Sequence, residues 1–507
     1  MVGLLLGSGL SVGAASGQTM LTGVFSTITQ DPPPGSNLPG SVTYVLTDDA
    51  GTVTVLQIAP QSLQAAGGSL RLDRQRVTTT GVVVPTTQAN TIPTLTVQSV
   101  VLTNKSTTNR APTRQVVGAQ PYVNVLCKFS DVADEPFMPS YITGLMGTGY
   151  GSLGGFFSEA SFGNINLNGT VTENWAVLPR LKADYVVLDA RGGPTDAALD
   201  LMAQDCAKLI PTTLDMTPFV GLNFIFNEML GNVAVGGTGT NLTINGINKF
   251  WSSTWMPPWG VQNGYRGLTG GQTVLAHEMG HAFGLRHSAG PTGVTYKNAW
   301  DVESDTYINC GLPNATDPTY GCLGQHMIAF DKDFLGWIPA AKKFTYAGTG
   351  QTLTFGALAD ASTPNIQIAV IPHTGTTTQF TTVEFRRQIL YDQKLAGNAI
   401  IIHEVDTTRA DPAWVVGTDG NAGAMFTAGM NYIAPNSGNV PVTINAISGT
   451  TATVAIGAPP APRPGPLPPV RTGPTSSGPP PPPIPGGPRP GGTIPGSTPA
   501  PMPMIPR

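Results

Sequence analysis

Charged side chains are scarce in this chain of 507 residues. They make up 11% of the sequence, against about 25% in ordinary soluble domains. Lys and Arg number 26 and Asp and Glu number 30, so the net charge is −4. A nucleic-acid-binding protein carries a basic excess, and none is present here. The 62 glycines, with abundant Thr and Val, favour a fold rich in strands and loops.

Long apolar runs are also missing beyond the first residues. None reaches the roughly 18 residues that a bilayer-spanning helix needs, so we expect no membrane span. The start, MVGLLLGSGLSVGAASGQT, joins an apolar run to small residues as a secretory signal does, although no basic residue precedes Arg71. We interpret residues 1–20 as a signal peptide of a secreted or cell-wall protein. A buried strand is the alternative.

Cysteine is rare, and none occurs before position 127. An even set in an exported chain indicates two disulfides, and the last two cysteines would close a short loop. A role as zinc ligands is disfavoured, because no Cys-x-x-Cys pair exists. The four candidates are Cys127, Cys206, Cys310 and Cys322.

Hydrophobic periodicity predicts an α+β fold in several parts. Residues 21–118 contain alternating runs such as TVTVLQIAP, which are typical of a small antiparallel β domain. Residues 119–340 mix strands such as FVGLNFIFN with a helix that Thr195 caps. Strand patterns return in 341–457 and favour a β-sandwich. The Pro-rich tail 458–507 cannot bury enough apolar surface to fold, so we expect it to be disordered.

Three of the six histidines fall in one short stretch, HEMGHAFGLRH. His277 and His281 are four residues apart, so a helix places both imidazoles on one face, where one metal ion can reach both. Gly284 is suited to end that helix in the left-handed conformation, after which His287 returns as a third ligand. Three nitrogens leave a fourth zinc position open for water, which is the arrangement of a catalytic site.

Glu278 stands beside a ligand and is suited to act as the general base. Zinc lowers the pKa of a bound water to roughly 7, so a carboxylate can take its proton near neutral pH. The complete pattern His-Glu-x-x-His-x-x-Gly-x-x-His is far more specific than His-Glu-x-x-His alone.

These residues resemble the metzincin zinc endopeptidases. More narrowly, VNVLCKFSD, FFSEASFGNINLNGTVTENW and HMIAFDKDFLGWI are similar to the gametolysin (peptidase M11) family, over roughly Pro121 to Pro339. The resemblance implies a metzincin-like catalytic domain at 119–340 and a secreted zinc metalloendopeptidase that cleaves extracellular matrix or cell-wall proteins. It implies one Zn²⁺ held by His277, His281 and His287, with Glu278 as the base.

One position departs from that family. Metzincins carry a methionine in a turn beneath the zinc ligands, and the matching segment AWDVESDTY has Glu303 there. Met327 is a competing candidate, but its helical spacing with Phe330 and Phe334 favours core packing. Tyr307, near this turn, is a candidate for support of the oxyanion, with a packed structural tyrosine as the alternative.

Two questions about function stay open at this level. The N-terminal β domain is compatible with a removable propeptide, and without a cysteine it cannot act through a thiolate at the zinc. The alternative interpretation is a catalytically weak or inactive metzincin-like protein with a binding or structural role. Glu303 at the methionine position favours this alternative. The intact histidines and Glu278 favour the enzyme.

Overall fold

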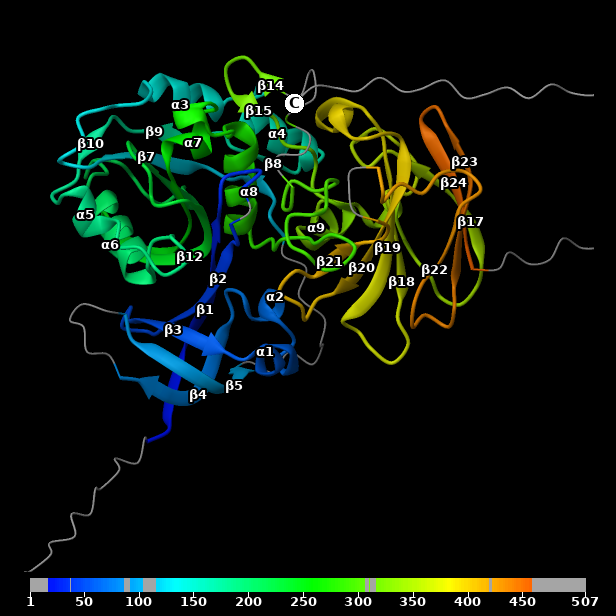
Figure 1. Ribbon diagram of the computed structural model, residues 1–507, viewed down its shortest axis with the longest axis horizontal. Coiled ribbons are helices and arrows are strands. Elements are labelled where there is room, and N and C mark those ends of the chain that lie inside the picture. Colours follow the sequence, from blue (N-terminus) through cyan, green and yellow to red (C-terminus); the bar gives the residue numbers. More distant parts are fainter. Residues whose placement is uncertain are drawn as a thin grey trace, which may run out of the picture. The chain divides into compact units, whose positions relative to one another are not determined.

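The computed structural model describes residues 17–36, 38–85, 92–103, 115–305, 310, 316–418 and 422–457. Most of the predicted signal peptide and the Pro-rich tail therefore lie outside the described residues. The described chain is a mixture of α and β in which strands predominate (Figure 1). Within it, no helix combines the length and the apolar character that crossing a membrane requires.

The first part of the chain is a twisted sheet with two short helices. Its pairs are antiparallel except β3 with β5, which is parallel, so the expectation of a purely antiparallel domain was wrong for that pair. The first strand begins at Thr19, inside the segment assigned to the signal peptide. The elements are β1 (Thr19–Asp31), β2 (Ser41–Thr47), β3 (Val53–Ile58), α1 (Pro60–Ala65), α2 (Ser69–Leu72), β4 (Arg76–Val84) and β5 (Thr94–Leu102).

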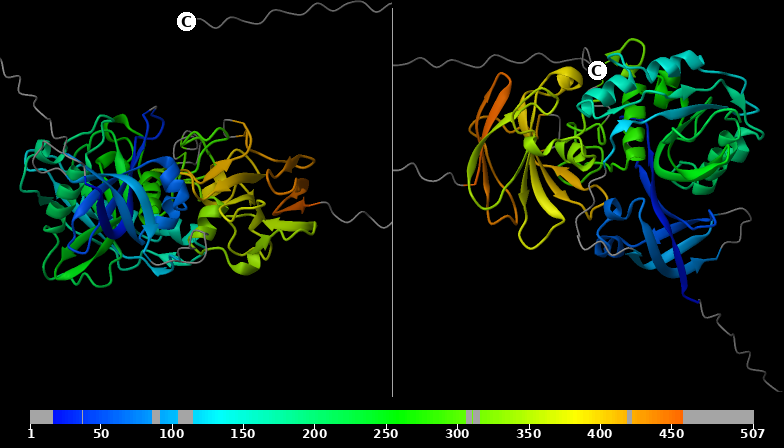
Figure 2. Two further views of the ribbon diagram at one scale, coloured as in Figure 1. Left: turned by 90° about the horizontal axis from the view of Figure 1, so that it is seen from below. Right: turned by 180° about the vertical axis from the view of Figure 1, so that it is seen from behind.

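Strand β1 extends beyond this sheet and joins the middle part of the chain. Its last residues, Ile28–Asp31, pair antiparallel with β12 (Ala234–Ile244). Among the described residues the two parts thus share one eleven-stranded sheet, with the order β10-β7-β11-β13-β12-β1-β2-β3-β5-β4 and β9 paired to β7. Figure 2 (right) shows β1 rising from the N-terminal strands beside helix α8.

The middle part has helices on both faces of its strands. Along β7, Val123 and Val125 point into the core beneath α6, while Tyr122 and Leu126 point into the core beneath α4 and α8, which is the two-residue alternation of a strand buried on both faces. Its helices are α3 (Pro139–Leu145), α4 (Leu153–Ala160), α5 (Lys182–Tyr185), α6 (Asp196–Ala207), α7 (Pro258–Val261), α8 (Gln272–Phe283) and α9 (Ala329–Phe334). Its other strands are β6 (Gly118–Ala119), β7 (Tyr122–Lys128), β8 (Ile165–Asn166), β9 (Val171–Thr172), β10 (Ala176–Val177), β11 (Gly221–Phe226), β13 (Ile247–Met256), β14 (Thr316–Asp317) and β15 (Gly321–Cys322).

Helix α6 bears out the predicted cap. The Thr195 hydroxyl accepts a hydrogen bond from the backbone N–H of Ala198 at 3.3 Å, which satisfies one of the unpaired donors of the first turn. Leu199, Met202 and Cys206 are buried. Leu209 lies beyond the end of the helix and is half-buried.

The last part consists of two sheets that share one apolar core, to which Phe385, Ile400 and Ile402 contribute from one sheet and Val442 and Val454 from the other. The first sheet has the order β16-β18-β19-β20-β21 and the second β17-β24-β23-β22. Their strands are β16 (Lys343–Thr345), β17 (Gln351–Gly356), β18 (Ile368–Pro372), β19 (Gln379–Arg386), β20 (Ala399–Asp406), β21 (Ala413–Val415), β22 (Asn431–Ile433), β23 (Pro441–Ser448) and β24 (Thr451–Ile456).

A buried charge network ties these sheets to the middle part. The Arg386 guanidinium is fully buried and pairs with Glu384 at 3.1 Å and Asp392 at 2.7 Å. It also donates to the backbone oxygens of Trp300 and His326. A buried guanidinium needs this many acceptors, because an unpaired buried charge costs several kcal/mol.

The two disulfides differ in the length of chain that they close. Cys127 bonds to Cys206, 79 positions away, and Cys310 bonds to Cys322, 12 positions away. The loss of chain entropy in the unfolded state predicts stabilisations of about 4.5 and about 3 kcal/mol, respectively. We predict that replacing both Cys127 and Cys206 by Ala lowers the melting temperature more than the same change at Cys310 and Cys322. Thermal denaturation measures this, and non-reducing peptide mapping should detect both links; an equal loss would contradict the loop-length argument.

The buried side chain of Lys332 should make the free energy of unfolding depend on pH. Its ammonium group is fully buried above the Phe162 ring, and burial lowers its pKa to about 7. The unfolded chain binds this proton up to about pH 10, so the free energy of unfolding should rise as pH rises above 7. We predict that the wild type gains about 2 kcal/mol relative to Lys332→Met between pH 7 and 9. Urea unfolding of both chains at the two pH values measures it, and a pH-independent difference would contradict it.

Candidate metal centre

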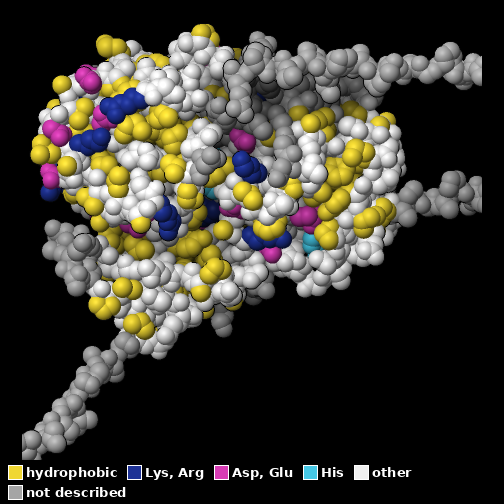
Figure 3. Space-filling model, in the orientation of Figure 1, with side chains coloured by type: hydrophobic (Ala, Val, Ile, Leu, Met, Phe, Trp, Pro, Cys, Tyr) yellow, Lys and Arg dark blue, Asp and Glu magenta, His cyan; other side chains and the backbone are white. Residues whose placement is uncertain are grey.

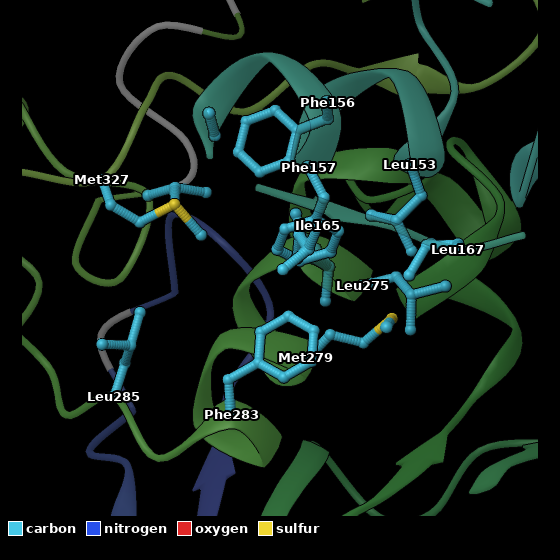
Figure 4. Close-up of a cluster of buried hydrophobic side chains, with 14 of the residues drawn as sticks. Leu153, Phe156, Phe157, Ile165, Leu167, Leu275, Met279, Phe283, Leu285 and Met327 are labelled. Atoms are coloured by element: carbon cyan, nitrogen blue, oxygen red, sulfur yellow. The ribbon is translucent and has the colours of Figure 1, made fainter. Parts of the chain in front are cut away.

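One face of helix α8 packs into the apolar core, and the other carries two of the histidines. Leu275, Met279 and Phe283 project from one face into the core, where Phe283 packs on Phe157 of α4 with ring centroids 5.2 Å apart (Figure 4). Burial of each such side chain contributes about 1.5–3 kcal/mol. This anchoring fixes the rotation of the helix, so His277 and His281 both point from its other face.

The end of α8 brings the third histidine back. Gly284 has φ 103°, the left-handed conformation predicted for it, and the helix ends at Phe283. The chain then reverses, so that the His287 ring lies 4.7 Å from the ring of His281, measured between centroids. The structure therefore brings His277, His281 and His287 together, and all three are buried.

The hydrogen bonds of two rings settle which nitrogens face the centre. Nδ1 of His277 lies 2.7 Å from the carbonyl oxygen of Val302, and Nδ1 of His281 lies 3.1 Å from that of Leu285. A carbonyl oxygen only accepts, so each Nδ1 carries the proton. The Nε2 lone pairs of these two rings are consequently left to face each other and His287.

The distances between these nitrogens fit a metal ion. The Nε2 atoms of His277 and His281 are 3.1 Å apart, those of His281 and His287 also 3.1 Å, and those of His277 and His287 3.3 Å. A tetrahedral zinc ion with Zn–N bonds of about 2.1 Å separates its ligands by about 3.4 Å. Imidazole nitrogens with second hydrogen bonds to carbonyls are also the usual donors for zinc.

Asp31, at the end of β1, completes the cluster and corrects one expectation. Its carboxylate oxygens lie 2.8 Å from Nε2 of His287, 3.3 Å from that of His281 and 3.6 Å from that of His277. The four side chains form one buried group that could hold a metal ion. The fourth position, expected to be open for water, therefore faces a carboxylate of the chain itself. Burial works to raise the pKa of Asp31, and the histidines outweigh it and hold that pKa well below its usual value.

Tyr296 holds Asp31 from the other side. Its hydroxyl donates a hydrogen bond to Asp31 Oδ1, and its ring packs against His287 with centroids 4.7 Å apart. Its φ is 62°, a conformation that is strained for an aromatic residue. A Cβ atom on Gly40 would lie 2.0 Å from this hydroxyl, so the loop after β1 must have glycine there for Tyr296 to fit.

Glu278 lies in a cavity beside the histidines. The cavity measures about 310 Å³, and its lining includes His277, Glu278, Tyr296 and the segment Asp31–Ser36. Glu278 is fully buried, and neither carboxylate oxygen has a hydrogen-bond partner among the described residues. Burial, with the neighbouring Asp31 carboxylate, raises its pKa well above the usual value.

Glu303 lies beneath the histidines, where it neither faces solvent nor accepts a hydrogen bond from a ligand ring. It is fully buried, so it does not turn to solvent, and Nδ1 of His281 bonds to Leu285 and lies 3.7 Å from Glu303. A Cβ on Gly280 would lie 1.9 Å from its Oε1. Within the described part of the chain its oxygens have no hydrogen-bond partner. Burial, together with the nearby Asp301 carboxylate, raises its pKa well above the usual value.

Met327 and the remaining three histidines do not belong to the cluster. Met327 is buried in the core beside α4, as its spacing predicted (Figure 4). His326 bonds to Glu159, His403 to Asn298 and His373 to Thr381, which are structural pairings. Tyr307 falls outside the described residues, so its predicted oxyanion role is untested.

Two residues of the site, Asp31 and Tyr296, were not predicted from the sequence. Asp31 precedes Tyr296 by 265 positions, and neither residue belongs to a recognisable motif. Comparison with models of known protein families and with curated protein sequences gave no match. The geometry of the cluster thus carries the functional argument.

We predict that Glu303→Met keeps the metal and raises stability. The thioether fills the same buried space, and removal of an unpartnered polar group recovers about 1–3 kcal/mol. Zinc content by elemental analysis and the melting temperature measure the outcome. Asp301→Leu is the matched control, because Asp301 accepts hydrogen bonds from Ser288 and from the backbone of Glu303, and it should lose stability. Loss of zinc in Glu303→Met would show an essential role for the carboxyl group.

Proposed function

We propose that this chain is a secreted zinc endopeptidase of the metzincin type, related to the gametolysin family, which cleaves extracellular matrix or cell-wall proteins. The single observation that carries the proposal is the convergence of three imidazole nitrogens, 3.1 to 3.3 Å apart, beside Glu278 in a cavity. A structural zinc site has no use for an unpartnered acid at its edge, whereas hydrolysis needs one.

The chain's own residues divide the work. His277, His281 and His287 would hold Zn²⁺, which supplies Lewis acidity that activates water and polarises a peptide carbonyl. Val302 and Leu285 orient two of the rings through their carbonyl oxygens. Glu278 would take a proton from water and pass it to the leaving amine.

Export is supported by coarser features. The two disulfides favour an oxidising compartment. Charged groups are scattered thinly over the face seen in Figure 3, in keeping with a sequence in which 11% of the residues are charged and the net charge is −4. Protein and peptide substrates, rather than nucleic acid, fit this surface.

Asp31 favours a second candidate function. Four protein ligands around zinc are the mark of a closed structural site, and a carboxylate within 2.8 Å of His287 supplies the fourth. In this reading the chain is an inactive binding or structural protein, stabilised by its metal.

We predict that Glu278→Ala retains about one zinc per chain, because three histidines remain, and lowers hydrolysis by about 10²- to 10⁴-fold. Casein hydrolysis is measured in four chains: the wild type, Glu278→Ala, Asp31→Ala, and the double variant of Asp31 and Glu278. The products are identified by mass spectrometry. The Asp31→Ala chains are included because Asp31 faces the fourth position of the metal site. A chelator should abolish any cleavage, and added zinc should restore it.

Glu135→Ala is the control for this test. Glu135 is a surface acid paired with Lys128, so its removal should leave zinc and hydrolysis unchanged. Undiminished hydrolysis in Glu278→Ala would remove this residue from the mechanism. Absence of cleavage in every chain would favour the structural protein.

A further inference from the structure

We propose that the N-terminal sheet is an intramolecular inhibitor, in which β1 places Asp31 on the zinc ion as a removable fourth ligand. The inference rests on the proposed peptidase function and adds its regulation. The inhibitory group is a carboxylate, and the described chain is the latent form of the enzyme. Release of β1 opens the metal to water and substrate.

The first support is the way in which Asp31 reaches the metal. Strand β1 adds to β12 through its last four residues, with Ile28 opposite Gly237 and Asp31 opposite Ala234. Addition of a strand to a sheet edge is a general mode by which one segment binds another through backbone hydrogen bonds. The register therefore aims one particular side chain at the histidines.

Side-chain contacts hold this strand in place. Arg286, one residue before the ligand His287, donates to Thr27 at 2.8 Å. The Thr238 hydroxyl of β12 accepts from the backbone N–H of Thr27 at 2.9 Å. Arg74, just before β4, donates to the carbonyl oxygen of Ala282 in α8 at 2.9 Å. The backbone N–H of Arg74 also donates to the carbonyl oxygen of Phe25 in β1 at 2.8 Å. Strand β1 is thus bonded directly to the edge strand, and through Arg74 to the helix that carries two of the ligands.

The residues that follow Asp31 explain why such a segment would survive in the site. Pro32, Pro33 and Pro34 line the cavity next to Glu278. Each of the three peptide bonds after Asp31 is a tertiary amide without an N–H donor and with a fixed φ. A peptidase that hydrogen-bonds to the backbone N–H groups of its substrate binds these bonds poorly, because they have no N–H group. The segment can therefore cover the site without being cleaved.

The unpartnered base distinguishes a removable ligand from a permanent one. Glu278 is fully buried beside this segment, and among the described residues nothing bonds to its oxygens. A permanent four-ligand site gains nothing from that buried acid, which costs stability. A latent site retains it because water and substrate become its partners when β1 leaves.

Tethering makes the carboxylate an effective inhibitor. A ligand linked to its own site acts at a high effective concentration, which raises occupancy by about 10²- to 10⁴-fold over a free one. Tyr296 adds a hydrogen bond that only a carboxylate turned toward the histidines receives. Water therefore competes poorly for the fourth position while β1 is in place.

The test compares full-length wild type with Asp31→Ala, Asp31→Asn and Asp49→Ala. Asp31→Asn keeps the shape of the side chain and serves if the alanine variant folds poorly. Asp49 is an exposed acid of the same sheet, paired with Arg76, and is the matched control. The readouts are the visible absorption spectrum of the cobalt-substituted chain, zinc affinity, and cleavage of a short peptide.

We expect both Asp31 variants to change the cobalt spectrum, to bind zinc at least about tenfold more weakly and to cleave the peptide about 100-fold faster or more, while Asp49→Ala matches the wild type. An unchanged spectrum would overturn Asp31 as a ligand. A wild type that cleaves as fast as its variants would overturn the inhibitory role and leave the peptidase function intact. A changed spectrum without cleavage in any chain would overturn both the peptidase function and its inhibition, and leave Asp31 a structural ligand.

Discussion

The centre of this molecule is a set of buried lone pairs that only a cation can satisfy. His277 and His281 each donate a hydrogen bond from Nδ1 to a carbonyl oxygen. Their Nε2 atoms therefore face each other and Nε2 of His287, at distances of 3.1 to 3.3 Å. Asp31 adds a further acceptor at 2.8 Å from His287. Without a positive charge this arrangement is repulsive, and with one it becomes strongly favourable. The rotation of α8, the turn at Gly284 and the path of β1 all meet this one requirement.

A shared cation would link parts of the chain that are far apart in the sequence. The histidines come from the middle part and the carboxylate from the N-terminal sheet, so a metal ion bound by all four would help to hold the two parts together. The Arg386 network, which reaches Trp300 and His326, fastens the C-terminal sheets to the same region. Glu303 is buried in this same region, 3.7 Å from Nδ1 of His281.

Sequence reasoning succeeded where the determining interactions are local. The spacing of His277 and His281, the left-handed Gly284 and the Thr195 cap each depend on a few adjacent residues, and the structure has them as expected. The parallel pairing of β3 with β5, the joining of β1 to β12 and the approach of Asp31 depend on contacts between distant segments. An aspartate before three prolines reads as a turn, and nothing near it in the sequence indicates a metal. The burial of Glu303 was equally illegible, since the same residue could have faced solvent.

The pairing of β1 with β12 also bears on how the protein would behave if that strand were released. The four residues of β12 that β1 covers, Ala234–Gly237, include Gly236 and Gly237. Exposed sheet edges invite pairing between molecules and so promote aggregation, and long, flat, hydrophobic edges do so most. This edge is short, and glycine weakens strands because it carries no side chain to pack. A bulge follows at Gly237 to Thr240, which twists the edge further from the flat geometry that fibrils need. A chain that has released β1 can therefore remain dispersed at concentrations where an ordinary uncovered edge would lead to precipitation.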